Sequence, residues 1–138
     1  ATLAGGGTRY NAHLLKEVRT YDSAELVDGY GEPPAEIIDI EPENLQAVLQ
    51  GMRDLVVSGS VAYYFKDCVV DAAAKTGTAQ TGVYDENGEE IENYWYAGYI
   101  CNAQEEPLYT LVVLEETAGE MHVPQAFRKI GEALVDFN

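Results

Sequence analysis

The sequence reads AAAKTGTAQ over residues 72–80. If this run is an extended strand, Thr76 and Thr78 share one face, because successive side chains of a strand alternate between faces. Lys75 and Gly77 then share the opposite face. Two hydroxyls on one face can bind a carboxylate, and a lysine adds a compact positive charge that favours an anionic ligand. A turn leading into a hairpin, with an exposed lysine, is the alternative interpretation of so short a motif.

The residues that follow predict a three-strand antiparallel meander. An Asn87-Gly88 pair within the acidic segment 85–90 is a strong hairpin-turn signal. Apolar runs at 94–101 and 108–114 predict two further strands, joined through residues 102–107. The expected architecture is therefore α+β, with an antiparallel β-sheet and helices packed against it.

Two helices are predicted, one before and one after the strands. Pro42 suits the first position of a helix, and Ser58-Gly59-Ser60 ends that helix. Its predicted buried face consists of residues at helical spacing: Leu45, Val48, Leu49, Met52, Leu55 and Val56. The last helix is predicted to open at residues 122–125, with an apolar stripe across the sheet made by Phe127, Ile130, Leu134 and Val135.

The first forty residues predict the end of a helix, a small hairpin and a loop. Residues 1–8 are similar to the last turn of a helix followed by a glycine stop, so we expect a helix that begins before residue 1. Segments 13–20 and 24–31 flank a turn-like sequence and predict two paired strands. The consecutive prolines at 33–34 predict a loop.

Composition excludes several classes of function. The chain has 138 residues, 46% of them hydrophobic, and can bury a small core. Its formal net charge of −16 argues against nucleic-acid binding and against a polybasic membrane contact, because both need clustered lysine and arginine. His13 and His122 have no Glu or Cys at metal-ligand spacing. We therefore expect no metal and no cofactor.

Together these features resemble the C-terminal half of a penicillin-binding protein transpeptidase domain. The resemblance is carried by Lys-Thr-Gly at 75–77, by NYWYAGY at 93–99 and by GMRDLVV at 51–57. The Thr-Ala-Gln continuation at 78–80 is more similar to the monofunctional, class B-like type than to the bifunctional type. The resemblance covers residues 1–138 as a C-terminal portion of the domain, truncated at its N-terminal side. It implies part of the fold shared by penicillin-binding proteins and serine β-lactamases.

The resemblance also implies roles for four residues. Lys75 would assist proton relay, and Thr76 and Thr78 would hold the substrate carboxylate while Gly77 permits close approach. The N–H of Thr78 would form half of an oxyanion hole. The partners of the complete domain would be peptidoglycan stem peptides, β-lactams and the missing N-terminal half. The parent protein would be anchored upstream and act at the extracytoplasmic face of the bacterial cell membrane, while this chain itself would be soluble.

Two elements that the resembling family requires are absent. The family's nucleophile lies in a Ser-x-x-Lys element, and its proton relay includes a Ser-x-Asn element. The chain has three serines, and none of them opens either element: Ser23, Ser58 and Ser60. Cys68 and Cys101 have no sequence-local basic partner, and both a disulfide and two reduced thiols remain open for them. The chain alone is therefore expected to be inactive.

Three functional hypotheses follow. The first is a part of a serine D,D-transpeptidase, and the second is a non-catalytic binding or sensory module that keeps the fold. The third, a β-lactamase relative, is less favoured because its members usually continue the Lys-Thr-Gly triplet differently. In the resembling fold, strand 108–114 pairs on its far side with a strand of the N-terminal half, so its unpaired edge predicts self-association of this chain.

Overall fold

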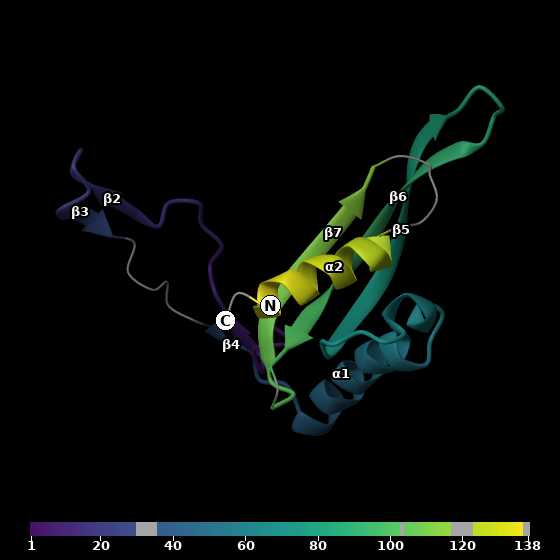
Figure 1. The fold of residues 1–138 in the computed structure, drawn as a ribbon, viewed down its shortest axis with the longest axis horizontal. Coiled ribbons are helices and arrows are strands. Elements are labelled where there is room, and N and C mark those ends of the chain that lie inside the picture. The colour runs from purple at the N-terminus through teal and green to yellow at the C-terminus, as the bar shows by residue number, and fades with distance from the viewer. Residues whose placement is uncertain (30–35, 103, 117–122, 137–138) are drawn as a thin grey trace. The chain divides into compact units, whose positions relative to one another are not determined.

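The structure is a computed structural model that describes residues 1–29, 36–102, 104–116 and 123–136. The chain divides into two compact units, Ala1–Glu41 and Pro42–Asn138. Figure 1 traces both, and the second unit contains the Lys-Thr-Gly run. None of the helices in the described ranges is long and apolar enough to cross a membrane.

The first unit opens on a glycine stop. The N–H of Gly6 donates to the carbonyl of Leu3 at 3.2 Å, and the N–H of Gly7 donates to the carbonyl of Thr2 at 2.9 Å. Both glycines have positive φ angles, 65° and 96°. This pair of bonds is the Schellman arrangement of a helix C-terminus. Residues 2–7 form hydrogen-bonded turns, and the chain continues into β1 (Thr8–Arg9), which pairs with β4 (Glu36–Ile37).

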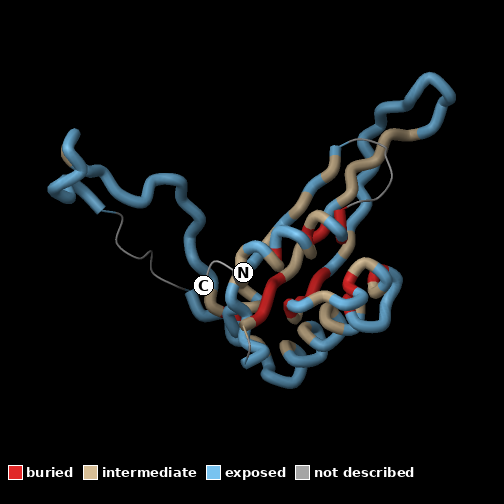
Figure 2. The backbone as a smooth tube through the Cα atoms, viewed as in Figure 1, coloured by how far each residue is buried: buried red, intermediate tan, exposed pale blue. Residues whose placement is uncertain are grey.

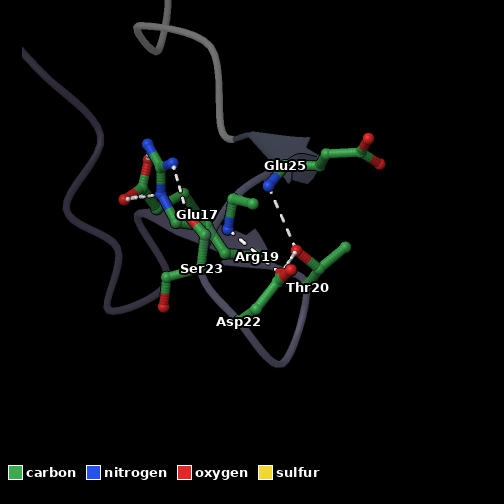
Figure 3. A network of polar contacts seen from close by, with 7 residues as sticks. Glu17, Arg19, Thr20, Asp22, Ser23 and Glu25 are labelled. Atoms are coloured by element: carbon green, nitrogen blue, oxygen red, sulfur yellow. Dashed lines mark hydrogen bonds and ion pairs between the residues drawn. The ribbon is translucent and has the colours of Figure 1, made fainter.

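Polar contacts, rather than a core, hold the hairpin of β2 (Glu17–Arg19) and β3 (Leu26–Gly29). Thr20 donates from its hydroxyl to Asp22 at 2.6 Å and accepts from the N–H of Glu25 at 3.1 Å (Figure 3). The Thr20 hydroxyl also lowers the pKa of Asp22. Every residue of both strands is exposed. The predicted hairpin is confirmed, with strands shorter than the apolar runs suggested.

The second unit is built on an antiparallel sheet in the order β5-β6-β7. Its strands are β5 (Ala72–Tyr84), β6 (Glu90–Cys101) and β7 (Pro107–Glu115). The Asn87-Gly88 turn connects β5 and β6, and Gly88 takes a φ of 82°. The predicted meander is therefore confirmed, and Figure 1 shows its long β5–β6 hairpin.

Two α-helices and one 3-10 helix pack on this sheet. The helix α1 (Pro42–Val57) contacts β5, and α2 (Val123–Asp136) lies over β6 and β7 (Figure 1). Both lie where the sequence predicts them, although His122 falls outside the described residues. The short η1 (Ala62–Phe65) contacts both helices and was not predicted.

The core lies between the sheet, η1 and α2. The buried stretches in Figure 2 include the start of β5 and the second half of β6. The side chains of Tyr96, Ile100 and Phe127 are fully enclosed. Ala72 and Ala74 belong to the same cluster, so this face of β5 is the one that packs toward α2.

Two predicted core residues are exposed instead. Val48 is 47% exposed and Ile130 is 42% exposed. The helix α1 contacts only β5 and η1 appreciably, so its buried stripe is narrow and Val48 lies outside it. In α2 the line facing the sheet passes through Gly131, where an added Cβ would lie 2.6 Å from Ile100 Cδ1. The close approach of Ile100 at Gly131 leaves Ile130 beside the contact rather than within it.

Candidate functional site at the edge of the sheet

The strand β5 leaves the core at the Lys-Thr-Gly run. Its first three residues, Ala72, Ala73 and Ala74, are buried, whereas Lys75 is exposed. Ala74 pairs with Gly98, where an added Cβ would lie 2.1 Å from the carbonyl oxygen of Ala73. Small residues at these positions therefore let β5 and β6 approach closely and anchor the strand just before the run.

A pocket of about 320 Å³ lies against the run. Its wall on β5 is formed by Thr76, Gly77 and Thr78. The other lining residues come from η1 and its preceding turn, from β6 and from the first turn of α2: Ser60, Val61, Tyr64, Tyr94, Trp95, Tyr96, Val123 and Pro124. None of the described residues that line it carries a charge. We call it the β5–β6 pocket.

Lys75 does not line this pocket. The strand alternation places its side chain on the face opposite Thr76 and Thr78. Its Nζ donates to the backbone carbonyl of Thr76 at 2.6 Å. The structure thus places Thr76, Gly77 and Thr78 on the wall of the pocket and leaves the Lys75 side chain outside it. Because β5 pairs only with β6 in the described part of the sheet, a ligand at its open edge is accessible from both faces.

Tyr96 is a pocket residue to which the sequence assigned no role. Its side chain is fully buried, and its hydroxyl has no hydrogen-bond partner among the described residues. Burial raises the pKa of Tyr96, so the phenol stays protonated. Tyr96 pairs with Thr76 across β5 and β6. The pairing register of the predicted meander would therefore have indicated that Tyr96 lies beside the Lys-Thr-Gly run. For Ser60, an exposed residue just after α1, the sequence held no such signal.

The two cysteines are free thiols, which resolves the alternative left open above. Desolvation is the main cause that raises the pKa of each thiol, Cys68 and Cys101. A raised pKa lowers the thiolate fraction at neutral pH, and the thiolate is the nucleophile. Neither cysteine lines the β5–β6 pocket. The geometry therefore favours neither as a replacement nucleophile.

The described residues contain no cluster of three or more His, Cys, Asp or Glu side chains that could hold a metal ion. Between Asp71 and Asp85 the sequence has a single charged residue, Lys75. What the arrangement offers chemically is a cation on one side of an edge strand and two hydroxyls on the other.

The chain is similar to known penicillin-binding proteins in sequence and in fold. The family model described as penicillin binding protein transpeptidase domain matches residues 1–132. Penicillin-binding protein 2A of Bacillus subtilis (strain 168) is 31% identical over 85 residues, which cover 59% of this chain and 12% of that protein. The structure is similar to penicillin-binding protein 2B from Streptococcus pneumoniae (strain R6), with a TM-score of 0.75 and 16% identity.

That structural match covers 99% of this chain and 23% of the other, so the chain spans only a small part of each relative. At 16% identity the likeness shows the fold alone, and the predicted α+β transpeptidase fold is confirmed by it. The family match extends over nearly all of the chain and includes the Lys-Thr-Gly strand. The chain belongs to the penicillin-binding protein transpeptidase domain family.

Proposed function

We propose that the chain is part of a serine D,D-transpeptidase of the monofunctional, class B-like type. The complete enzyme would cross-link peptidoglycan stem peptides and be acylated by β-lactams. The observation that carries this proposal is the edge strand β5, with Lys75 on one face and the hydroxyls of Thr76 and Thr78 on the other. The family match over residues 1–132 supports it.

A carboxylate at the open edge of β5 would be reached both by the ammonium group of Lys75 and by the hydroxyls of Thr76 and Thr78. Lys75 would supply the positive charge and assist the proton relay, and the two threonine hydroxyls would donate hydrogen bonds. The backbone N–H of Thr78 would donate to the oxyanion that forms when a serine hydroxyl attacks the scissile carbonyl. The serine would then carry the acyl group as an ester, and the leaving amine would take up a proton.

The nucleophile would have to come from outside these residues. None of the three serines of the chain opens Ser-x-x-Lys or Ser-x-Asn, so residues 1–138 alone would be inactive. The protein that contains this domain would act at the extracytoplasmic face of the bacterial cell membrane, where its substrate is located.

The test is acylation of the full-length protein by a fluorescent penicillin, followed by intact mass. We expect Lys75→Met to slow acylation by about 10²-fold or more, the range for loss of a proton-transfer group. The matched control is Lys129→Met, which removes an exposed lysine of α2. Residues 1–138 alone should gain no adduct. An adduct on that short chain would overturn the account of the nucleophile, and equal rates for Lys75→Met and wild type would overturn the role of Lys75.

A second candidate is a non-catalytic binding or sensory module. The observation that favours it is the absence of both serine elements from the chain. The same labelling experiment separates the two, because a module would leave the full-length protein without any covalent adduct.

We also propose that the isolated chain self-associates through residues 108–114. The strand β7 pairs only with β6 in the described sheet, and Val112 on it is 59% exposed. An unpaired apolar edge favours pairing with a second chain. We expect Val112→Lys to lower the associated fraction in sedimentation, while Val83→Lys, at a similarly exposed position on β5, leaves it unchanged. A strictly monomeric wild-type chain over a wide concentration range would contradict this proposal.

A further inference from the structure

We propose that Asn87 is a site of spontaneous covalent modification, at which it becomes an aspartyl or isoaspartyl residue, and that Asp85 restrains the reaction. Both residues lie in the turn between β5 and β6. This inference goes beyond the transpeptidase proposal and does not depend on it.

The residue that follows Asn87 is the first observation. The attacking atom in this reaction is the main-chain nitrogen of the next residue, and glycine permits its close approach because it has no Cβ. Of the asparagines in the chain, only Asn87 precedes a glycine: Asn11, Asn44, Asn87, Asn93, Asn102 and Asn138. A Cβ added at Gly88 would have nothing within 4 Å. The space beside the attacking nitrogen is therefore open.

The turn lies at the exposed end of the β5–β6 hairpin (Figure 2). Every residue from 77 to 89 is exposed, and the pairing register shifts between Gln80 and Tyr84. Segments with few buried contacts and exposed hydrogen bonds open at low free energy. Water and base therefore reach Asn87 each time the turn opens.

Asp85 holds the reacting groups while the turn is closed. Its carboxylate accepts from the N–H of Asn87 at 2.9 Å and from the side-chain amide of Asn87 at 3.3 Å. Its carbonyl accepts from the N–H of Gly88, which carries the attacking nitrogen, at 3.1 Å. The N–H of Glu89 also donates to the carboxylate, at 2.9 Å, and is the main cause that lowers the pKa of Asp85. The reaction therefore requires the bonds to Asp85 to open.

The chemistry needs only water and a base. The nitrogen of Gly88 gives its proton to the base and attacks Cγ of Asn87, and the new C–N bond closes an imide ring. The bond from Cγ to Nδ2 breaks, and Nδ2 takes up a proton and leaves as ammonia. Water then cleaves the ring at one of its two carbonyl carbons. Cleavage at Cγ gives aspartate, whereas cleavage at the main-chain carbonyl carbon gives an isoaspartyl residue, in which the main chain runs through Cβ and Cγ.

The product disturbs the turn in two ways. It adds a carboxylate beside Asp85, Glu86 and Glu89, within a stretch of sequence, residues 76–127, that contains no lysine or arginine. Like charges at such short range repel one another. The isoaspartyl product also lengthens the main chain between Asp85 and Gly88, so the hydrogen bond that closes the turn is lost.

The experiment is peptide mapping of the full-length protein after incubation in a mildly alkaline buffer prepared with water enriched in a heavy oxygen isotope. Chymotrypsin cuts after Tyr84 and Tyr94 and so releases residues 85–94, which contain Asn87 and Asn93. Fragmentation of this peptide by mass spectrometry measures both asparagines together. We expect Asn87 to gain one oxygen from the water, while Asn93, which precedes a tyrosine inside β6, stays unmodified.

Gly88→Ala tests the attack by the main-chain nitrogen. We expect it to slow the conversion of Asn87 at least about tenfold, which corresponds to a barrier raised by about 1.4 kcal/mol. Gly88 has a φ of 82°, so alanine strains the turn and favours its opening. A slower reaction would therefore report the blocked nitrogen and not a tighter turn.

Asp85→Ala tests the restraint and should speed the conversion about fivefold, the effect of one lost hydrogen bond. The matched control is Glu86→Ala, which removes a carboxylate of the same turn that bonds to neither Asn87 nor Gly88 among the described contacts, and it should leave the rate unchanged. The proposal is overturned if Asn87 stays as unmodified as Asn93, or if Gly88→Ala converts as fast as wild type. Equal rates for Asp85→Ala and Glu86→Ala would overturn the restraining role of Asp85.

Discussion

Gly98 determines how closely β5 and β6 approach each other. It pairs with Ala74, directly before the Lys-Thr-Gly run, and an added Cβ would lie 2.1 Å from the Ala73 carbonyl oxygen and 2.8 Å from Ala74 Cβ. The first of these atoms belongs to the backbone and cannot rotate away. A side chain at this position must therefore displace β5 itself.

We expect Gly98→Ala to lower the free energy of unfolding by about 1–3 kcal/mol, the usual cost of overpacking. The measurement is urea denaturation monitored by circular dichroism. The control is Gly51→Ala, because Gly51 lies inside α1 and a Cβ added there would have nothing within 4 Å. That substitution should raise stability by about 0.5–1 kcal/mol through helix propensity. A neutral Gly98→Ala would show that the strands have room to separate.

At the scale of elements, one arginine connects α2 to the end of η1. Arg128 donates to the backbone carbonyls of Tyr64 at 3.1 Å and Lys66 at 2.9 Å, and its Nε donates to Glu132 at 2.8 Å. The hydrogen bond from Arg128 is the main cause that lowers the pKa of Glu132 below its ordinary value of 4.5. This connection holds the η1 wall of the β5–β6 pocket against α2.

The sign of the pH dependence follows from the lowered pKa. A carboxyl whose pKa is lower in the folded chain contributes stability above its unfolded pKa, and that contribution is lost as pH falls through the folded value. We therefore expect the melting temperature of wild type to fall more than that of Glu132→Gln as pH is lowered from about 5.5 to 3. Glu86→Gln, in the exposed hairpin turn, is the control and should follow wild type. Parallel curves for wild type and Glu132→Gln would contradict the role of the ion pair.

Elements with explicit start and stop signals were predictable from the sequence. Pro42 and Ser58 bracket α1 as predicted, and Asn87-Gly88 marks the turn between β5 and β6. The four-residue η1 has no such signals, because one turn of 3-10 helix is too short to show a period. Only the structure therefore reveals that η1 forms part of the pocket wall.

For the candidate site, the residue types and their strand alternation were predictable, but the surroundings of each side chain were not. Alternation along a strand predicts that Lys75 and Thr76 point in opposite directions, and the structure agrees. The unpaired hydroxyl of Tyr96 was not predictable, because it depends on which side chains of η1 and α2 surround it. Tertiary packing, not local pattern, determines that environment.

At the scale of the whole molecule, acidic charge dominates. The chain carries 24 Asp and Glu residues against 8 Lys and Arg residues. Such an excess repels itself in the compact state, and salt screens the repulsion over a Debye length of about 10 Å at 0.1 M.

We expect the melting temperature to rise by about 4 °C, or about 1 kcal/mol, between 10 mM and 200 mM sodium chloride. The measurement is a thermal melt followed by circular dichroism at a fixed, low protein concentration, so that association does not contribute. Repeating it with sucrose in place of salt controls for solvent exclusion, which does not depend on charge. A melting temperature that is independent of salt would mean that local ion pairs offset the excess negative charge.

The way β5 leaves the core has a further consequence for backbone dynamics. Its amides at 72–74 lie in the most enclosed part of the sheet, while those beyond Thr78 belong to an exposed hairpin. Hydrogen exchange reports such differences as a gradient of local opening free energies along one strand. The Lys-Thr-Gly run lies where the expected exchange rate changes from slow to fast. A ligand bound at this edge would therefore extend slow exchange outward along β5, toward the hairpin.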